Sequence, residues 1–246
     1  MLPDTVNTLA VSEQARRRAA RIWAERRRFE LEAAQRFAWM AGELRTLGAS
    51  ARVSEQAEMA ADDELRHADS CARLTEHFGR AAADATPQPL RRVAPRGLDR
   101  KDALHYEIVA LSCVTETLST ALLGALLECA TDSLAKRTMH SILRDEVRHS
   151  RLGWAYLTEV SSQRAMDAVS AHLPAMLQAT LSSELFDETP VDPVQAELAG
   201  LGQLERRERL RVVRETLECV VFPGLARYGA DVSPGKHWLE RAALRP

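Results

Sequence analysis

The pentapeptide Asp-Glu-Leu-Arg-His at Asp63–His67 recurs almost unchanged as Asp-Glu-Val-Arg-His at Asp145–His149. In both copies a Glu precedes a His by three residues, and no other place in the chain has this spacing. On a helix, side chains three residues apart lie about 60° apart around the axis and less than one turn apart along it. Each pair can therefore present a carboxylate oxygen and an imidazole nitrogen to one metal ion, if the two helices face each other.

A single helical Glu precedes each pentapeptide by a similar distance. Glu30 lies 34 residues before Glu64, and Glu116 lies 30 residues before Glu146. Four-helix bundles hold di-iron and di-manganese sites with four carboxylates and two imidazoles in this order. Two divalent ions would also balance the charge of four carboxylates, which would otherwise repel one another or take up protons. The predicted metal ligands are Glu30, Glu64, His67, Glu116, Glu146 and His149.

The choice of Glu116 depends on the strongly apolar segment 108–127, in which it is the acidic residue. A helix that is apolar on all sides is buried, so a carboxylate inside it needs a partner. Glu107 and Glu128 lie toward the ends of the same predicted helix, where we expect water to solvate them easily.

The choice of Glu30 depends on its position around the first predicted helix. The helix also carries Glu25 and Glu32. At about 100° per residue, Glu30 falls about 60° from the centre of the apolar stripe, Glu25 nearly 80° and Glu32 nearly 100°. Glu30 is thus preferred over Glu25 by about 20°.

Asp63 and Asp145 each precede a candidate ligand His by four residues. Because a metal-bound His usually donates its second ring N–H to a carboxylate, both Asp residues are predicted to support the ligands. Each could face the His of its own helix or reach the opposite His across an antiparallel bundle. Small or apolar residues near the ligands are candidates for a substrate cavity, with plain core packing as the alternative: Ala33, Phe37, Cys113, Thr120 and Leu123.

The sequence predicts an all-α protein built around a four-helix bundle. Only 11 Gly and 10 Pro occur among 246 residues, and aromatic residues make up 5%. Apolar residues recur at helical spacing in four segments, and a long connection rich in Pro and Gly, residues 79–100, forms the expected crossover between the second and third helices. The four helices are expected at about residues 12–47, 53–78, 101–131 and 133–159.

Residues 161–246 are predicted to form further helices that pack on the bundle. One amphipathic segment carries Met166 to Leu181, with Pro174 expected to kink or split it, and another runs from Leu204 to Pro223. No change in composition marks a second domain. We expect one domain, residues 1–246, with a bundle core at about 12–160 and this C-terminal extension.

Composition argues against several other classes of protein. The net charge is −2, so no overall field favours nucleic acid or anionic membrane, and no run approaches the roughly 20 apolar residues of a membrane span. The four Cys residues form no Cys-x-x-Cys pair, and the N-terminus does not look like a secretion signal, so we expect a cytoplasmic protein with reduced thiols. The arginine runs Arg16–Arg18 and Arg26–Arg28 are interpreted as a solvated helix face, with a partner or nucleic-acid contact as the alternative.

The ordered ligand set resembles that of the ferritin-like di-iron carboxylate superfamily. The run Glu30–Phe37 is similar to the first-helix motif of rubrerythrins, which supports Glu30. The run Asp145–Leu157 (DEVRHSRLGWAYL), the chain length and the C-terminal helices are loosely similar to the aldehyde-deformylating oxygenases and related bacterial di-iron oxidases. The resemblance implies a ferritin-like fold and two bound irons (or manganese, or one of each), with O₂ as cosubstrate.

Two departures from related families narrow the expected activity. Cys71 stands where ribonucleotide reductase small subunits commonly carry a radical-forming Tyr. Ile142 stands where arylamine N-oxygenases carry a seventh ligand, a His. The rubredoxin-type Cys-x-x-Cys module of many rubrerythrins is also missing. Cys71 and Ile142 therefore disfavour these two specific activities.

The expected function is an O₂-activating non-haem di-iron oxidase or oxygenase that acts on a small, largely apolar organic substrate. Because the chain carries no reductase or ferredoxin motif, electrons are expected from an external donor of that type. Two alternative functions would use the same ligands: a ferroxidase or peroxide-scavenging protein, and a transfer-RNA-modifying hydroxylase. A structural bundle without metal is a further alternative. Membrane partners are not expected and nucleic acid is disfavoured, while a homodimer stays open.

Overall fold

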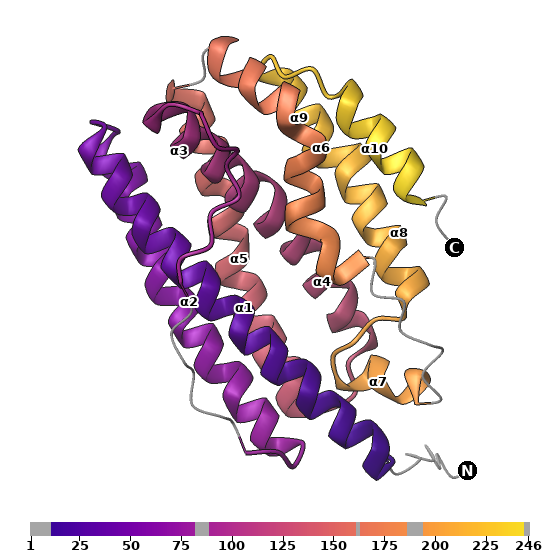
Figure 1. Ribbon diagram of the computed structural model, residues 1–246. Coiled ribbons are helices and arrows are strands. Elements are labelled where there is room, and N and C mark those ends of the chain that lie inside the picture. The colour runs from indigo at the N-terminus through magenta and orange to yellow at the C-terminus, as the bar shows by residue number, and fades with distance from the viewer. Residues whose placement is uncertain (1–10, 82–88, 161–162, 186–193, 244–246) are drawn as a thin grey trace, which may run out of the picture.

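The computed structural model describes residues 11–81, 89–160, 163–185 and 194–243. Helices account for nearly all of them, and these described residues contain no strand. Figure 1 shows a bundle of long helices with further helices on one side. The predicted all-α bundle is confirmed, and its helices are α1 (Glu13–Thr46), α2 (Ala51–His77), the composite helix α3–η1–α4 (Arg100–Cys129) and α5 (Ser133–Val160).

Local sequence signals set the helix limits. The side chains of Ser12, Ser50 and Asp99 accept hydrogen bonds from backbone N–H groups in the first turns of α1, α2 and α3, at 3.2, 3.4 and 2.8 Å. Such caps satisfy donors that have no partner inside the helix. After α1 the chain turns at Gly48, whose φ of +73° favours glycine.

The third bundle helix differs from the continuous α-helix that the sequence predicts. It consists of α3 (Arg100–Ile108), a seven-residue π-helical segment η1 (Val109–Thr115) and α4 (Glu116–Cys129). The Thr115 hydroxyl donates to the Ala110 carbonyl five residues earlier, at 3.0 Å, and so follows the π-helical spacing. Because η1 ends directly before Glu116, it sets the direction in which that carboxylate points. Single π-helical turns are frequent at functional sites.

This composite helix is long and apolar enough, by composition, to span a membrane, with a mean hydropathy of 1.6 over its most apolar window. The expectation that no segment is apolar enough to span a membrane is therefore wrong. In the structure, 61% of that window is buried inside the fold. The apolar character is explained by the central position of the helix in the bundle.

A long connection joins α2 to α3, which run in the same direction through the bundle (Figure 1). Of the predicted crossover, residues 82–88 lie outside the described residues. The part that follows is tied to the bundle by Glu107, which accepts hydrogen bonds from the Val93 and Ala94 N–H groups at 2.6 and 2.8 Å and pairs with Arg36 at 3.1 Å. Glu107 is buried, so the expectation of easy solvation is wrong.

The C-terminal residues form helices that pack on the side of the bundle bounded by the third helix (Figure 1). Leu173, Phe222 and Leu239 from this region join the same apolar cluster as Val109 of the bundle. Pro174 lies inside α6 and does not split it. The helices are α6 (Gln163–Leu185), α7 (Gln195–Leu201), α8 (Arg206–Thr216), η2 (Leu217–Val221), α9 (Phe222–Arg227) and α10 (Ser233–Ala243).

Candidate metal centre

The candidate site is a polar layer between two apolar cores. On α1 one core ends at Trp23 and the other begins at Phe37, and on α5 they are separated between Ile142 and Leu152. Five of the six predicted ligands fall in the gaps between these cores along their own helices, whereas Glu116 lies between Val114 and Leu118 at the edge of the core that contains Phe37. Burying this much polarity is costly unless the groups satisfy one another or bind an ion.

The structure brings the six predicted ligands together. Their donor atoms form two overlapping groups, each with all atoms within 4.8 Å of one another. One group contains Glu30 and His67, the other Glu116 and His149, and both include Glu64 and Glu146. Five of the residues are at most 3% exposed, whereas the Glu30 side chain is 17% exposed. Two neighbouring metal positions that share two carboxylates fit this arrangement.

Both imidazoles direct Nδ1 into the cluster. Nδ1 of His67 lies 2.8 Å from Glu64 Oε2 and 3.7 Å from Glu146 Oε1. Nδ1 of His149 lies 2.9 Å from Glu64 Oε1 and 3.6 Å from Glu146 Oε2. Glu64 and Glu146 thus stand between the two His residues and could serve both metal positions. Glu30 and Glu116 stand at the outer ends.

The opposite ring nitrogens reach carboxylates on the other helix. Nε2 of His67 lies 3.3 Å from Asp145 Oδ2, and Nε2 of His149 lies 3.1 Å from Asp63 Oδ2. Of the two arrangements that the sequence left open, the structure therefore has the crosswise one. Both Asp residues also contact Arg148, at 2.9 Å for Asp63 and 2.8 Å for Asp145, and these contacts hold the carboxylates in place.

The cluster contains more acidic than basic groups: four carboxyl groups and two imidazoles. Burial, followed by the charge of Glu64, raises the pKa of Glu30 well above its usual value, and burial with the charge of Glu146 does the same for Glu116. Burial would also raise the pKa of Glu64, but contacts with His149 and His67 outweigh it and lower that pKa to about 2. Although burial opposes it, the contact with Asp63 raises the pKa of His149. Protons thus supply part of the positive charge that this acid-rich cluster needs.

Several inward-facing atoms fit a metal ion. Glu64 Oε1, Glu146 Oε2 and His149 Nδ1 are buried and make no hydrogen bond of good geometry to a residue that the structure describes, although His149 Nδ1 lies 2.9 Å from Glu64 Oε1. These atoms belong to the two groups that share carboxylates. Carboxylate oxygens and imidazole nitrogens are suitable donors for iron and manganese. The residues present therefore fit a two-metal centre.

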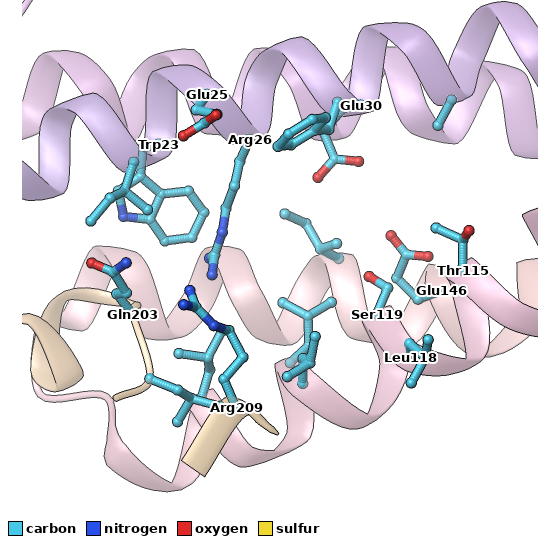
Figure 2. A pocket seen from close by; sticks show the side chains of 18 of the residues that line it. Trp23, Glu25, Arg26, Glu30, Thr115, Leu118, Ser119, Glu146, Gln203 and Arg209 are labelled. Atoms are coloured by element: carbon cyan, nitrogen blue, oxygen red, sulfur yellow. The ribbon is translucent and has the colours of Figure 1, made fainter. Parts of the chain in front are cut away.

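A cavity of about 270 Å³ opens on the cluster between α1, α4, α5, α6 and α8 (Figure 2). Glu30, Glu64, Glu116 and Glu146 all contribute to its wall. Apolar residues line much of the remainder: Ile22, Phe29, Leu118, Leu122, Leu123, Leu126, Ile142, Leu181, Leu204 and Val213.

The predicted cavity residues are divided between this cavity and the core. Ala33 and Leu123 line the cavity. The Phe37 ring instead packs 5.4 Å from the His149 ring, and Cys113 is fully buried where η1 meets α5. The Thr120 hydroxyl donates to the Glu116 carbonyl at 2.8 Å. Phe37, Cys113 and Thr120 are not part of the wall.

Sequence reasoning missed the arginines that line the cavity. Arg18, Arg21, Arg26 and Arg209 all belong to its wall. The interpretation of the first-helix arginines as a solvated face holds for Arg17 and Arg28, which are exposed, but not for Arg18 and Arg26. The available signal was spacing, because Arg26 precedes Glu30 by four residues and so shares its helix face.

No protein-family model matches the sequence, and no curated protein matches it either. Among solved structures, the chain is similar to one described as "Protein 19 with aldehyde deformylating oxidase activity from Synechococcus". The TM-score is 0.60 at 20% identity, and the match covers 92% of this chain and 97% of that chain. At this identity the likeness shows the fold, and the predicted ferritin-like architecture is confirmed.

Proposed function

We propose that this protein is an O₂-activating di-iron oxidoreductase that acts on a small organic substrate. The observation that carries the proposal is the pair of donor groups sharing Glu64 and Glu146, placed against a cavity with apolar walls. The described activity of the similar solved structure, an aldehyde-deformylating oxidase, supports the reaction class but not a particular substrate.

In this proposal Glu64 and Glu146 would contribute to both metal positions. Glu30 and His67 would hold one ion with them, and Glu116 and His149 would hold the other. Two iron ions so held would supply electrons to O₂ in pairs. The buried ligands keep water away from the ions, and Asp63 and Asp145 keep each imidazole oriented with Nδ1 toward the centre.

The cavity favours an organic substrate over Fe(II) as the only substrate. Ligand sites are typically concave and mostly apolar with a few polar groups, and this cavity has that character. Its wall includes Ser119 together with Glu30 and Glu146 of the cluster (Figure 2). An iron-storage function would not require an apolar cavity on the cluster.

The reaction class requires an outside source of electrons. Insertion of one oxygen atom of O₂ into a C–H bond forms one C–OH group and one water, and it consumes two electrons and two protons beyond those of the substrate. We propose a separate reductase or ferredoxin-type protein as the electron donor.

Anaerobic reconstitution with Fe(II), followed by rapid mixing with O₂, tests the proposal. We expect two irons per chain, and we expect Glu116→Ala and His149→Ala to lose metal. Glu128→Ala, which changes an exposed Glu of α4, is the matched control. Turnover of excess Fe(II) into a ferric mineral would assign iron handling instead, and less than one metal per chain, insensitive to both ligand variants, would contradict a metal centre altogether.

A further inference from the structure

Two arginines meet at the end of the cavity away from the carboxylates. In Figure 2, Arg26 reaches across from α1 and Arg209 reaches back from α8, so that their guanidinium groups point toward each other. Trp23 and Gln203 lie beside them, whereas Glu30 and Glu146 lie at the opposite end. The cavity is therefore polarised along its length, with acidic groups at one end and cations at the other.

Arg26 is held in place by an aromatic platform. Its guanidinium lies 4.6 Å from the centre of the Trp23 ring, and the Trp23 indole N–H donates to the Leu201 carbonyl at 2.9 Å. Stacking on an aromatic face restricts the guanidinium and leaves its edge available for hydrogen bonds. The C-terminal extension thus contributes to this end of the cavity through Leu201, Gln203 and Arg209.

One donor of Arg26 lacks a protein acceptor. Its Nη1 is buried and has no hydrogen-bond partner in the described part of the chain. Arg26 and Arg209 both line this end of the cavity, and their positive charges favour an anion there.

The space between the two ends is short and apolar. Arg26 and Glu30 are one helical turn apart on α1, a rise of about 6 Å. Apolar residues of α4, among them Leu122 and Leu123, also line the cavity. A ligand that fills the cavity would meet cations, then hydrocarbon, then the carboxylate cluster.

We propose that the substrate is a small amphiphile whose anionic group, a carboxylate or a phosphate monoester, binds between Arg26 and Arg209. Its apolar part then points toward Glu30, Glu116 and Glu146, so that the carbon nearest the metal ligands is remote from the anion. The inference rests on the proposed function for its reaction, but the binding mode can be tested without turnover.

Binding of octanoate, octyl phosphate and octan-1-ol to the protein, with and without Mn(II), tests this binding mode. Calorimetry gives the affinities, and quenching of Trp23 fluorescence, assigned with Trp23→Phe, reports on occupancy of the arginine end. We expect at least one of the anions to bind about tenfold or more tighter than the alcohol, since hydrogen bonds to a charged group are the strong ones. The preferred anion identifies the head group.

The variants Arg26→Gln and Arg209→Gln should weaken binding of that anion about tenfold and change binding of octan-1-ol less than about twofold. Arg26→Lys should restore part of the affinity, and Arg17→Gln, an exposed arginine of the same helix, should have no effect. Circular dichroism confirms that each variant folds.

Equal affinity for the anions and the alcohol, or an equal loss with Arg17→Gln, would overturn the proposal. Anion binding that requires Mn(II) and is unchanged in Arg26→Gln would also overturn the proposal, because the anion would then bind to the metal rather than to the arginines. Failure of the proposed function has a different signature: metal is not bound, yet the arginine-dependent preference for anions persists in the metal-free protein.

Discussion

Asp63 of α2 accepts a hydrogen bond from Nε2 of His149, which lies on α5, at 3.1 Å. The reciprocal pair, His67 and Asp145, has the same geometry at 3.3 Å. Each pentapeptide therefore supplies the carboxylate that orients the imidazole of the other. Because the two copies are interlocked, damage to the Asp of one helix should appear at the ligand of the opposite helix.

Asp63→Asn should weaken metal binding about 10-fold or more, chiefly at the position that includes His149. The substitution removes the negative charge that makes the imidazole a better ligand. Titration with Mn(II), followed by electron paramagnetic resonance, measures the loss. Asp62→Asn, a change of the exposed neighbouring residue, is the control. Unchanged Mn(II) affinity in Asp63→Asn would mean that Asp63 has only a structural role.

Metal binding should release protons. Burial raises the pKa of Glu30 and Glu116, and these carboxyls ionise only as the pH rises through the raised values. Metal requires the ionised forms, so the apparent affinity should rise with pH and fall as the pH is lowered. Calorimetry with Mn(II) at pH 7, in two buffers of different ionisation enthalpy, counts the protons. We expect about one or more per chain.

Glu116→Gln distinguishes this source of protons from others. The variant has no carboxyl to ionise at that position, so it should release fewer protons for each Mn(II) that still binds. Identical heats in both buffers for the unaltered protein would contradict the predicted protonation of the metal-free cluster.

Gly153→Ala should lower the free energy of unfolding by about 1–3 kcal/mol. A Cβ at Gly153 would lie 2.6 Å from the Cys113 Sγ atom and 3.0 Å from the Cys113 backbone N, so α5 and η1 would have to separate. Urea unfolding measures the change. At Gly42 of α1 a Cβ would meet nothing within 4 Å, so Gly42→Ala should stabilise the helix by about 0.5–1 kcal/mol. Similar effects at both positions would disprove the close approach.

Stability should fall between pH 6.5 and pH 4 because of His105. Burial lowers the pKa of His105 from 6.5 to about 4, and its Nε2 lies 3.4 Å from the Met166 sulfur. Above pH 6.5 the His105 imidazole is neutral in both the folded and the unfolded protein. Between pH 6.5 and pH 4 it takes up a proton in the unfolded protein but stays neutral in the folded protein. At pH 5 the loss should be about 2 kcal/mol relative to pH 7.

Comparison with His105→Gln isolates this contribution, because other groups titrate in the same range. Urea unfolding at pH 7 and pH 5 gives the change in the free energy of unfolding for each protein, and the difference between these two changes is the contribution of His105. If the unaltered protein and His105→Gln lost the same stability between these pH values, the assignment to His105 would be wrong.

The positions of the six candidate ligands followed from the sequence because helical geometry is local. A spacing of three residues places Glu64 beside His67 whatever surrounds the helix. The apolar run around Glu116 likewise indicates burial, and the structure does bury this residue. The structure brings these six side chains together, while their role as metal ligands stays a prediction.

Relationships between helices were decided only by the tertiary structure. Whether Asp63 faces His67 or His149 depends on the register of α2 against α5, and only the packed structure shows the π-helical segment before Glu116 and the close approach of Gly153 to it. Arg26 and Arg209 lie 183 positions apart in the chain, and only the packing of α8 on the bundle brings them to one cavity. The sequence by itself thus determined which side chains share a helix face, since that depends on the backbone repeat. Tertiary packing decided which faces meet, because the close contacts of many distant residues set it together.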